Sequence, residues 1–331
     1  MANPGLTVHH GDTQISVGNN MQTSRRNFLK ATSVLSLAPA AVLGTAPKPA
    51  SYVDAHSHIW SADVKRWPLA EGLTVKDLKP KSFTDKELLK LCTPLSVRRV
   101  VLIQHNVYHK FDNSYITHAI KQNPGTFSGV AVIDHTQGTA TDVARRMVTL
   151  KAQGIRGFRI LPRKDTPEKW LQHEGMQTMW RTAGANGLAV CPLINPQFLP
   201  SVSAMCEKFP DTRVVIDHFA RVGVDGQIRQ ADLNSLCGLA KHKHTFVKIS
   251  AYYALGKKKP PYTDLLPMIK RVLDAFGPER LMWGSDCPYQ IRQGHSYEAS
   301  LRLISQGLDF VSKGDRDWLL TRTADKIFFT R

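Results

Sequence analysis

Several features that define other classes of protein are missing from this chain of 331 residues. It has no uninterrupted run of the ~18 apolar residues that a helix needs to span a bilayer, which argues against a transmembrane segment. Its five cysteines, at positions 92, 191, 206, 237 and 287, form no Cys-x-x-Cys pair, which argues against a thiolate zinc module. Because their number is odd, the pattern predicts no particular disulfide.

Negative charge is also scarce. The chain has 27 acidic residues against 44 lysines and arginines, which gives a formal net charge of +17. The basic residues are scattered along the chain and no nucleic-acid reading motif occurs, so we expect no nucleic-acid partner. A positive field attracts small anions such as a carboxylated substrate. A solvated basic surface explains the same composition, and the sequence leaves both interpretations open.

A glycine-rich phosphate loop, typical of a doubly wound open sheet, is absent after the first expected strand. Apolar β-rich segments instead alternate with helical patterns, among them a capping box at Thr84-Asp85-Lys86-Glu87. Nearly continuous apolar strands are typical of a parallel sheet covered by helices. We therefore expect a single-domain (β/α)8 TIM barrel over residues 51–331. Its eight strands are expected at 52–60, 98–106, 127–135, 154–161, 187–195, 213–221, 245–250 and 280–288.

Residues 1–50 are expected to precede this domain as an unstructured segment that carries an export signal. The stretch "SRRNFLK", with Arg25 and Arg26, matches the twin-arginine (Tat) signal and is followed by a short apolar run. The sequence thus predicts recognition by the Tat export machinery and a periplasmic location in a bacterium. The start at Met1 or Met21 and the cleavage site stay open, as does a chance arginine pair at a helix start.

Polar residues gather at the carboxyl ends of the expected strands, where the active site of such a barrel lies. His56 and His58 end the first strand, and residues two apart on a strand share a face, with Asp54 expected one pleat earlier. Two adjacent imidazoles can bind a metal ion or polarise a substrate oxygen. His218 ends the sixth strand and Asp286 the eighth. These residues are the candidate catalytic set.

A second His-x-His occurs at His242 and His244 in "KHKHTF". Lysines flank it and a strand follows it. We therefore expect it in a solvated turn at the opposite end of the barrel.

The segments "VDAHSHIW", "VVIDHFAR" and "LMWGSDCPY" resemble signatures of the amidohydrolase-related metal-dependent hydrolases. The resemblance covers residues 51–331 and is greatest to the branch that contains 2-pyrone-4,6-dicarboxylate lactonases and fuconolactonases. It implies a lactonase, a hydrolase of cyclic esters, whose substrate is a dicarboxylated pyrone or a sugar-acid lactone. In that scheme Asp286 is the general base, and His56, His58 and His218 polarise the carbonyl directly or through a metal.

The chain departs from the wider family at two places that concern the metal. The fifth expected strand, "VCPLIN", has no histidine, and the fourth, "FRIL", has no bridging lysine. We therefore expect no two-metal centre. The resemblance leaves open one divalent ion, Zn²⁺ or Mn²⁺, held by His56, His58 and Asp286 with or without His218, or a metal-independent reaction.

The same resemblance implies that Arg159 and Arg163 orient a substrate carboxylate, since a guanidinium can donate two parallel hydrogen bonds to it. Tyr252 and Tyr253 stand where the dicarboxylate enzymes have an arginine, and they complete the expected substrate-binding set. Two other functions remain as alternatives: a zinc-dependent non-oxidative decarboxylase of aromatic or unsaturated acids, and a barrel that binds a ligand without catalysis. The sequence does not indicate the oligomeric state.

Overall fold

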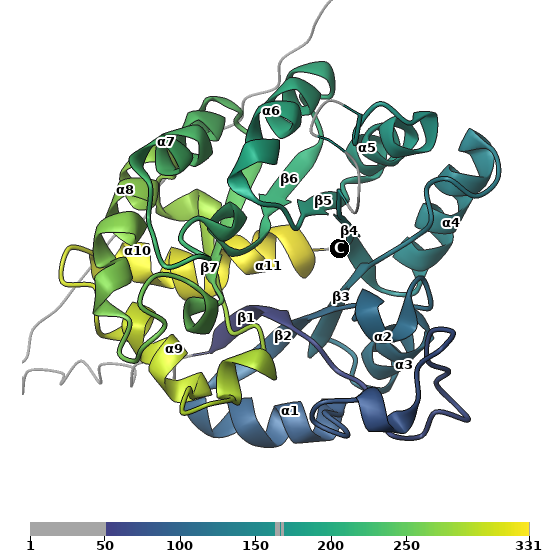
Figure 1. Ribbon diagram of the computed structural model, residues 1–331, viewed down its shortest axis with the longest axis horizontal. Coiled ribbons are helices and arrows are strands. Elements are labelled where there is room, and N and C mark those ends of the chain that lie inside the picture. The colour runs from purple at the N-terminus through teal and green to yellow at the C-terminus, as the bar shows by residue number, and fades with distance from the viewer. Residues whose placement is uncertain (1–50, 163–165, 167–168, 331) are drawn as a thin grey trace, which may run out of the picture. The chain divides into compact units, whose positions relative to one another are not determined.

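A computed structural model describes residues 51–330, apart from 163–165 and 167–168. The predicted export signal and Arg163 therefore lie outside the described residues. Eight parallel strands follow one another in sequence order around a barrel, with helices on its outside (Figure 1). The expected TIM barrel is confirmed. The strands are β1 Tyr52–Ser57, β2 Val97–Ile103, β3 Phe127–Ala131, β4 Ile155–Ile160, β5 Ala189–Pro192, β6 Arg213–Ile216, β7 Thr245–Ser250 and β8 Leu281–Gly284.

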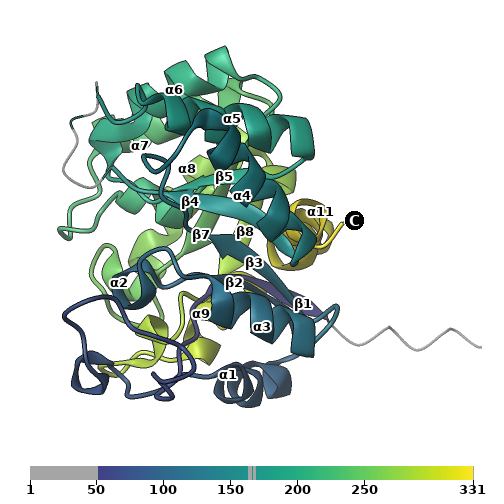
Figure 2. The same cartoon turned by 90° about the vertical axis from the view of Figure 1, so that its right-hand side faces the viewer.

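Helix α1 (Asp85–Cys92) begins where its capping residues predict. Thr84 and Glu87 form the expected capping box: Glu87 accepts the Thr84 backbone N–H at 2.7 Å, and Thr84 accepts the Glu87 N–H at 3.3 Å. Figure 2 shows α3, α4 and α5 covering the strands on their side of the barrel. No helix in the described ranges is long and apolar enough to cross a membrane. The helices are α1 Asp85–Cys92, α2 Asn106–His109, α3 Ser114–Gln122, α4 Ala140–Ala152, α5 Glu174–Asn186, α6 Leu199–Lys208, α7 Gln230–Gly238, α8 Leu266–Phe276, α9 Tyr297–Ser305, α10 Lys313–Asp317 and α11 Thr323–Phe328.

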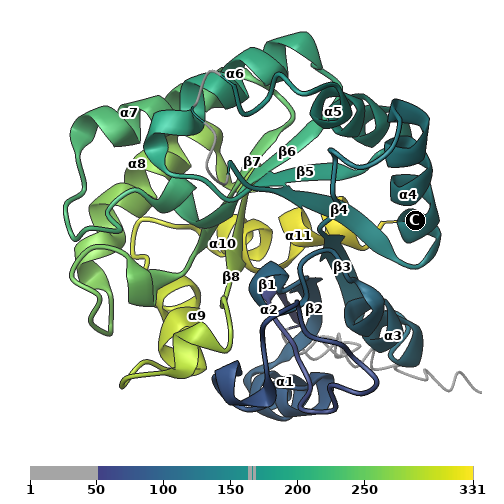
Figure 3. The same cartoon turned by 45° about the vertical axis from the view of Figure 1, so that its right-hand side comes forward.

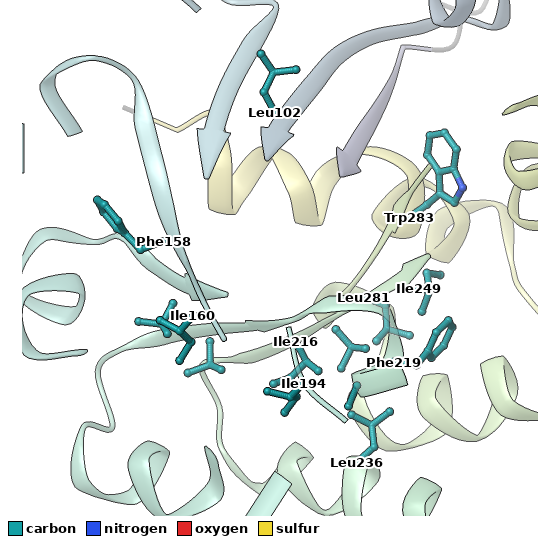
Figure 4. Packing of buried hydrophobic residues seen from close by; sticks show 14 of the residues in the cluster. Leu102, Phe158, Ile160, Ile194, Ile216, Phe219, Leu236, Ile249, Leu281 and Trp283 are labelled. Carbon is teal, nitrogen blue, oxygen red and sulfur yellow. The ribbon is translucent and has the colours of Figure 1, made fainter. Parts of the chain in front are cut away.

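Two apolar layers hold the barrel. The outer layer lies between strands and helices, and Figure 4 shows part of it, including Phe158 of β4 and Trp283 of β8. The inner layer contains Phe246 and Met282 together with Phe328 of α11, which lies across one end of the barrel (Figure 3). Burial of apolar area stabilises both layers by roughly 25 cal/mol per Å². Because α11 fills the amino-terminal end, the carboxyl ends of the strands are left for a polar site.

The barrel closes between β1 and β8 through a short seam. The backbone N–H of Asp286 donates to the His56 carbonyl at 2.7 Å, and that of His58 donates to the Cys287 carbonyl at 2.8 Å. Ser57 and Cys287 form an isolated parallel bridge. Closure of the barrel therefore sets the two histidines beside Asp286.

Asp54 does not share the face of His56 and His58, contrary to expectation. Its carboxylate accepts from the Ser285 N–H at 2.8 Å, the Ser285 hydroxyl at 2.6 Å and the Tyr297 hydroxyl of α9 at 2.8 Å. The register of β1 against β2 shifts between residues 54 and 57, so the regular alternation assumed for this strand fails there. Asp54 thus joins β1 to β8 and α9 rather than lining the site.

The chain leaves β6 earlier than predicted and enters a left-handed turn. His218, Phe219, Ala220 and Arg221 have φ values of 53°, 53°, 52° and 59°. Each non-glycine residue in this conformation costs roughly 1–2 kcal/mol. Such strain persists where the surroundings determine the conformation, and it clusters at functional sites. The turn carries His218 to the mouth of the barrel.

Candidate active site

Three histidines surround the Asp286 carboxylate at the carboxyl ends of the strands. The Nε2 atoms of His58 and His56 lie 3.3 and 3.5 Å from Oδ1, and Nε2 of His218 lies 3.7 Å from Oδ2. All four side chains are buried. The structure thus brings together the four residues that the sequence analysis placed in the catalytic set.

The surroundings of Asp286 favour its ionised form. Tyr253 donates a hydrogen bond to Oδ2 at 2.8 Å. Burial alone would raise the pKa of Asp286, but His218 and the hydrogen bond from His58 outweigh that effect and hold it below its ordinary value. An ionised, buried carboxylate can accept a proton from water.

His218 is held at its other ring nitrogen. Its Nδ1 lies 2.8 Å from the Ser250 hydroxyl, and burial lowers the pKa of His218 to about 4. The ring is therefore neutral at pH 7. The Ser250 hydroxyl has one proton, which it can donate to the Lys248 carbonyl at 3.4 Å or to Nδ1. When it donates to Nδ1, the ring proton is on Nε2, where it faces the site and can polarise a carbonyl oxygen.

A buried ion cluster lies next to His56. The Lys248 ammonium and the Arg159 guanidinium each lie 3.0 Å from an oxygen of Asp217, and Lys248 Nζ lies 3.3 Å from His56 Nδ1. Burial alone would raise the pKa of Asp217, but the two cations hold it well below its ordinary value. The sequence analysis missed Lys248; its signal was a lysine inside the apolar strand "TFVKIS".

Arg159 contacts His56 as well as the cavity. Its guanidinium donates to Nε2 of His56 at 2.8 Å, and because arginine cannot accept, this nitrogen offers its lone pair. Burial and the Lys248 ammonium lower the pKa of His56 well below its ordinary value, so the ring is neutral. Arg159 thus fixes His56 while it lines the site, and it is held by Asp217 before any substrate binds.

The two tyrosines expected to bind substrate separate in the structure. Tyr253 lines the cavity, whereas Tyr252 is fully buried and donates to the Ile249 carbonyl at 2.8 Å. Ala251 before them has a left-handed φ of 60°, which interrupts the extended backbone after β7. Tyr252 is therefore a core residue, and only Tyr253 reaches the site.

The cavity at this mouth has a volume of about 240 Å³ and suits a small ring. A larger hollow of about 780 Å³ lies on the outside, between α3 and α4, and contains none of the catalytic set. His105 and Tyr289, to which the sequence analysis assigned no role, both line the cavity. The lining residues are His58, His105, Asn106, Val107, Arg159, Leu193, His218, Arg221, Val224, Ala251, Tyr253, Ala254, Leu255, Asp286 and Tyr289.

The donor set at the centre suits one metal ion. Ligand atoms of His56, His58 and Asp286 all lie within 4.8 Å of one another, and Oδ1 of Asp286 is buried with no hydrogen-bond partner among the described residues. Nδ1 of His58 lies 2.9 Å from the Ile103 carbonyl and must donate to it, which leaves Nε2 facing Oδ1. In the neutral ring Nε2 then presents a lone pair to the carboxylate oxygen. This contact becomes favourable when Nε2 carries a second proton or when a cation lies between the two atoms. Nε2 of His56 already accepts a hydrogen bond from Arg159, so a cation that used this nitrogen as its third ligand would have to displace that bond.

Comparison with known families identifies the scaffold. The amidohydrolase family model matches residues 53–330. The chain belongs to the amidohydrolase family. It is 26% identical over 262 residues to L-fucono-1,5-lactonase of Burkholderia ambifaria, covering 78% of this chain and 88% of that one. It is 27% identical to 4-sulfomuconolactone hydrolase of Rhizobium radiobacter, covering 71% and 75%. These relatives are lactone hydrolases, in agreement with the expected activity.

Solved structures support the fold. A probable 2-pyrone-4,6-dicarboxylic acid hydrolase from Acinetobacter baumannii, with citric acid bound, has a TM-score of 0.70 at 23% identity, covering 85% of this chain and 100% of that one. An amidohydrolase from Burkholderia multivorans with bound zinc has a TM-score of 0.69 at 19% identity, covering 85% and 100%. A 5-carboxyvanillate decarboxylase from Sphingomonas paucimobilis is more distant, with a TM-score of 0.60 at 10% identity, covering 85% and 99%.

Proposed function

We propose that this amidohydrolase hydrolyses a small lactone that carries an acidic substituent. The observation that carries the proposal is the ionised Asp286 carboxylate between three histidines at the edge of a small, positively lined cavity. The relatives that are lactone hydrolases support the choice of bond.

In the proposed reaction Asp286 accepts a proton from a water molecule while the water oxygen attacks the lactone carbonyl. Tyr253 holds the carboxylate through Oδ2. The developing negative charge on the carbonyl oxygen is stabilised by an N–H of His218 and by the Arg159 guanidinium, because both groups line the cavity. Positioned donors of this kind each contribute about 10²–10³-fold to the rate.

The acidic substituent is proposed to bind Arg221. This residue ends the left-handed turn after β6, is exposed, and lines the same cavity. In the described part of the chain no carboxylate forms an ion pair with Arg221, whereas Arg159 is held by Asp217. A free guanidinium at the mouth can donate two hydrogen bonds to a carboxylate or sulfonate.

A divalent ion, when bound, would be held by His56, His58 and Asp286 and would supply Lewis-acid polarisation of the carbonyl. His58 keeps its Nδ1 bond to the Ile103 carbonyl in either case, which directs Nε2 toward Oδ1 of Asp286.

A panel of γ- and δ-lactones, with and without a ring carboxylate or sulfonate, tests the proposal through acid release read by a pH indicator. We expect acidic lactones to exceed their neutral counterparts at least tenfold in kcat/KM, since an Arg–carboxylate contact is worth roughly 1.5–3 kcal/mol. Arg221→Gln should remove this preference and leave turnover of neutral lactones. Release of CO₂ from aromatic acids, with no lactone hydrolysed, would instead support the decarboxylase alternative.

We also propose that residues 1–50 direct the chain to the periplasm through the Tat machinery, on the basis of Arg25 and Arg26. Replacement of both by lysine should retain the protein in the cytoplasm, as fractionation would show. Unchanged periplasmic accumulation of the double variant contradicts this proposal.

A further inference from the structure

A tyrosine and a histidine outside the expected catalytic set form a short hydrogen bond in the cavity. Nε2 of His105, which follows β2, lies 2.6 Å from the hydroxyl oxygen of Tyr289, which follows β8. Both residues line the cavity with Asp286 and His58. The pair therefore lies within reach of a bound ring.

The direction of this hydrogen bond follows from the backbone. Nδ1 of His105 accepts the N–H of Tyr108 at 3.3 Å, and a backbone N–H can only donate. Because Nδ1 uses its lone pair to accept this N–H, the His105 ring carries one proton and is neutral. Its single proton is therefore on Nε2 and is donated to Tyr289. The phenolic proton of Tyr289 is left unused, since its hydroxyl makes no other hydrogen bond in the described part of the chain.

Tyr253 provides the contrast in the same cavity. Its ring lies parallel to that of Tyr289, with centroids 6.2 Å apart, but its phenolic proton is already donated to Asp286. Tyr289 also has a cation over its ring: the guanidinium carbon of Arg292 lies 4.7 Å from the centroid. One Nη atom of Arg292 is buried and has no hydrogen-bond partner within the described ranges. A cation at the ring and an N–H at the oxygen both favour negative charge on Tyr289. Burial and the Asp286 carboxylate outweigh them and raise the pKa of Tyr289 to about 12, so the phenol keeps its proton until the leaving oxygen takes it.

We propose that Tyr289 is the proton donor to the leaving oxygen when the lactone ring opens. The inference rests on the proposed lactonase function and adds a catalytic residue to it. His105 and Arg292 act as positioning and charge-stabilising residues, because they contact Tyr289 rather than the reacting atoms.

The proposed ring opening conserves protons and electrons. Water bonds to the carbonyl carbon through its oxygen and gives one proton to Asp286. The ring C–O bond then breaks, its electron pair stays on the leaving oxygen, and that oxygen takes the phenolic proton of Tyr289. The Tyr289 phenolate, stabilised by the His105 N–H, recovers a proton from the Asp286 carboxylic acid through solvent. One water is consumed and one hydroxy acid is formed.

The dependence of the rate on the leaving group tests this role. An alkanol leaving group, as in δ-valerolactone, needs a proton as the bond breaks. A phenol leaving group, as in 3,4-dihydrocoumarin, needs little help because its conjugate acid has a pKa near ~10, like that of tyrosine. Tyr289→Phe should lower kcat for the alkanol lactone by roughly 10²–10⁴-fold, the range for loss of a general acid, and for the phenol lactone less than tenfold.

Tyr253→Phe is the matched control, since it removes a phenolic hydroxyl from the same cavity. It should lower kcat for both lactones by a similar factor, because it disturbs Asp286 rather than the leaving group. Retained turnover of the phenol lactone by Tyr289→Phe also shows that the variant is folded. Equal losses on both lactones in Tyr289→Phe would overturn the role of Tyr289 and leave the lactonase proposal intact. Absence of hydrolysis of any lactone by the wild-type chain would overturn the lactonase proposal itself, and this inference with it.

Discussion

The same His-x-His spacing occurs at two places in the chain, and the two places differ in every other respect. His56 and His58 are buried and contact Asp286. His244 is exposed, and His242 lies 2.9 Å from the Ser203 hydroxyl through its Nε2. The second pair is thus part of the surface.

The difference follows from the end of the strand at which each pair lies. His56 and His58 stand at the carboxyl end of β1, where β6 and β8 deliver His218 and Asp286. His242 and His244 precede β7 and therefore lie at the opposite end, which α11 and its apolar side chains fill. In a parallel barrel, position relative to the strand decides which residues of other strands a motif meets.

The largest effect should come from Asp286, the carboxylate that the first pair contacts and the second does not. Asp286→Asn keeps the shape of the side chain but cannot accept the proton of water. On the best lactone found, kcat should fall roughly 10²–10⁴-fold, with a smaller change in KM. Steady-state kinetics provide the measurement. Near-normal kcat in Asp286→Asn would contradict its role as base.

The second-largest difference between the two histidine pairs should be in metal binding. Titration with Zn²⁺ should give no more than one tight equivalent per chain, because the described residues contain one cluster of suitable ligands. His58→Asn should weaken that binding by at least tenfold, the lower range for loss of a single interaction at a metal site. His244→Asn serves as the control and should leave it unchanged. Two tight equivalents, or a loss caused by His244→Asn, would contradict the assignment.

The free energy of unfolding should depend on pH through Asp54, which joins β1 to β8 beside the first histidine pair. Burial raises the pKa of Asp54 to about 6, so the folded state favours its neutral form. The resulting stabilisation is complete below the unfolded-state pKa of ~4 and is lost as the pH rises through about 6. The difference in unfolding free energy between wild type and Asp54→Asn should therefore shrink by about 2 kcal/mol from pH 4 to pH 7. Urea unfolding at several pH values measures it, and a constant difference contradicts it.

The smallest effect should come from the second pair. His242→Asn and His244→Asn should leave kcat within about twofold and change the unfolding free energy by no more than ~0.5 kcal/mol, as for other surface substitutions. Kinetics and urea unfolding of the two variants provide the check. If they abolished activity, the orientation of the barrel would be wrong.

The sequence was sufficient to predict the barrel because its evidence is local. Apolar strands, capping residues such as Thr84, and polar residues at strand ends each depend on a few neighbouring positions. The same reasoning placed His56, His58, His218 and Asp286 together, since all parallel strands end at one side. The sequence predicted the ends of the strands poorly. A strand was expected over 213–221, but β6 ends at Ile216 because a strained left-handed turn follows.

The tertiary structure alone decided which of these groups interact. Lys248 and Asp217 stand 31 positions apart and meet only because β6 and β7 are neighbours, and His105 meets Tyr289 across 184 positions. Adjacent Tyr252 and Tyr253 differ because a left-handed residue turns the chain before them. The sequence by itself determined the fold and the candidate site residues, through short-range periodicity and strand polarity. Hydrogen-bond direction, ion pairing and the shape of the cavity arise from contacts between distant segments, which no local pattern encodes.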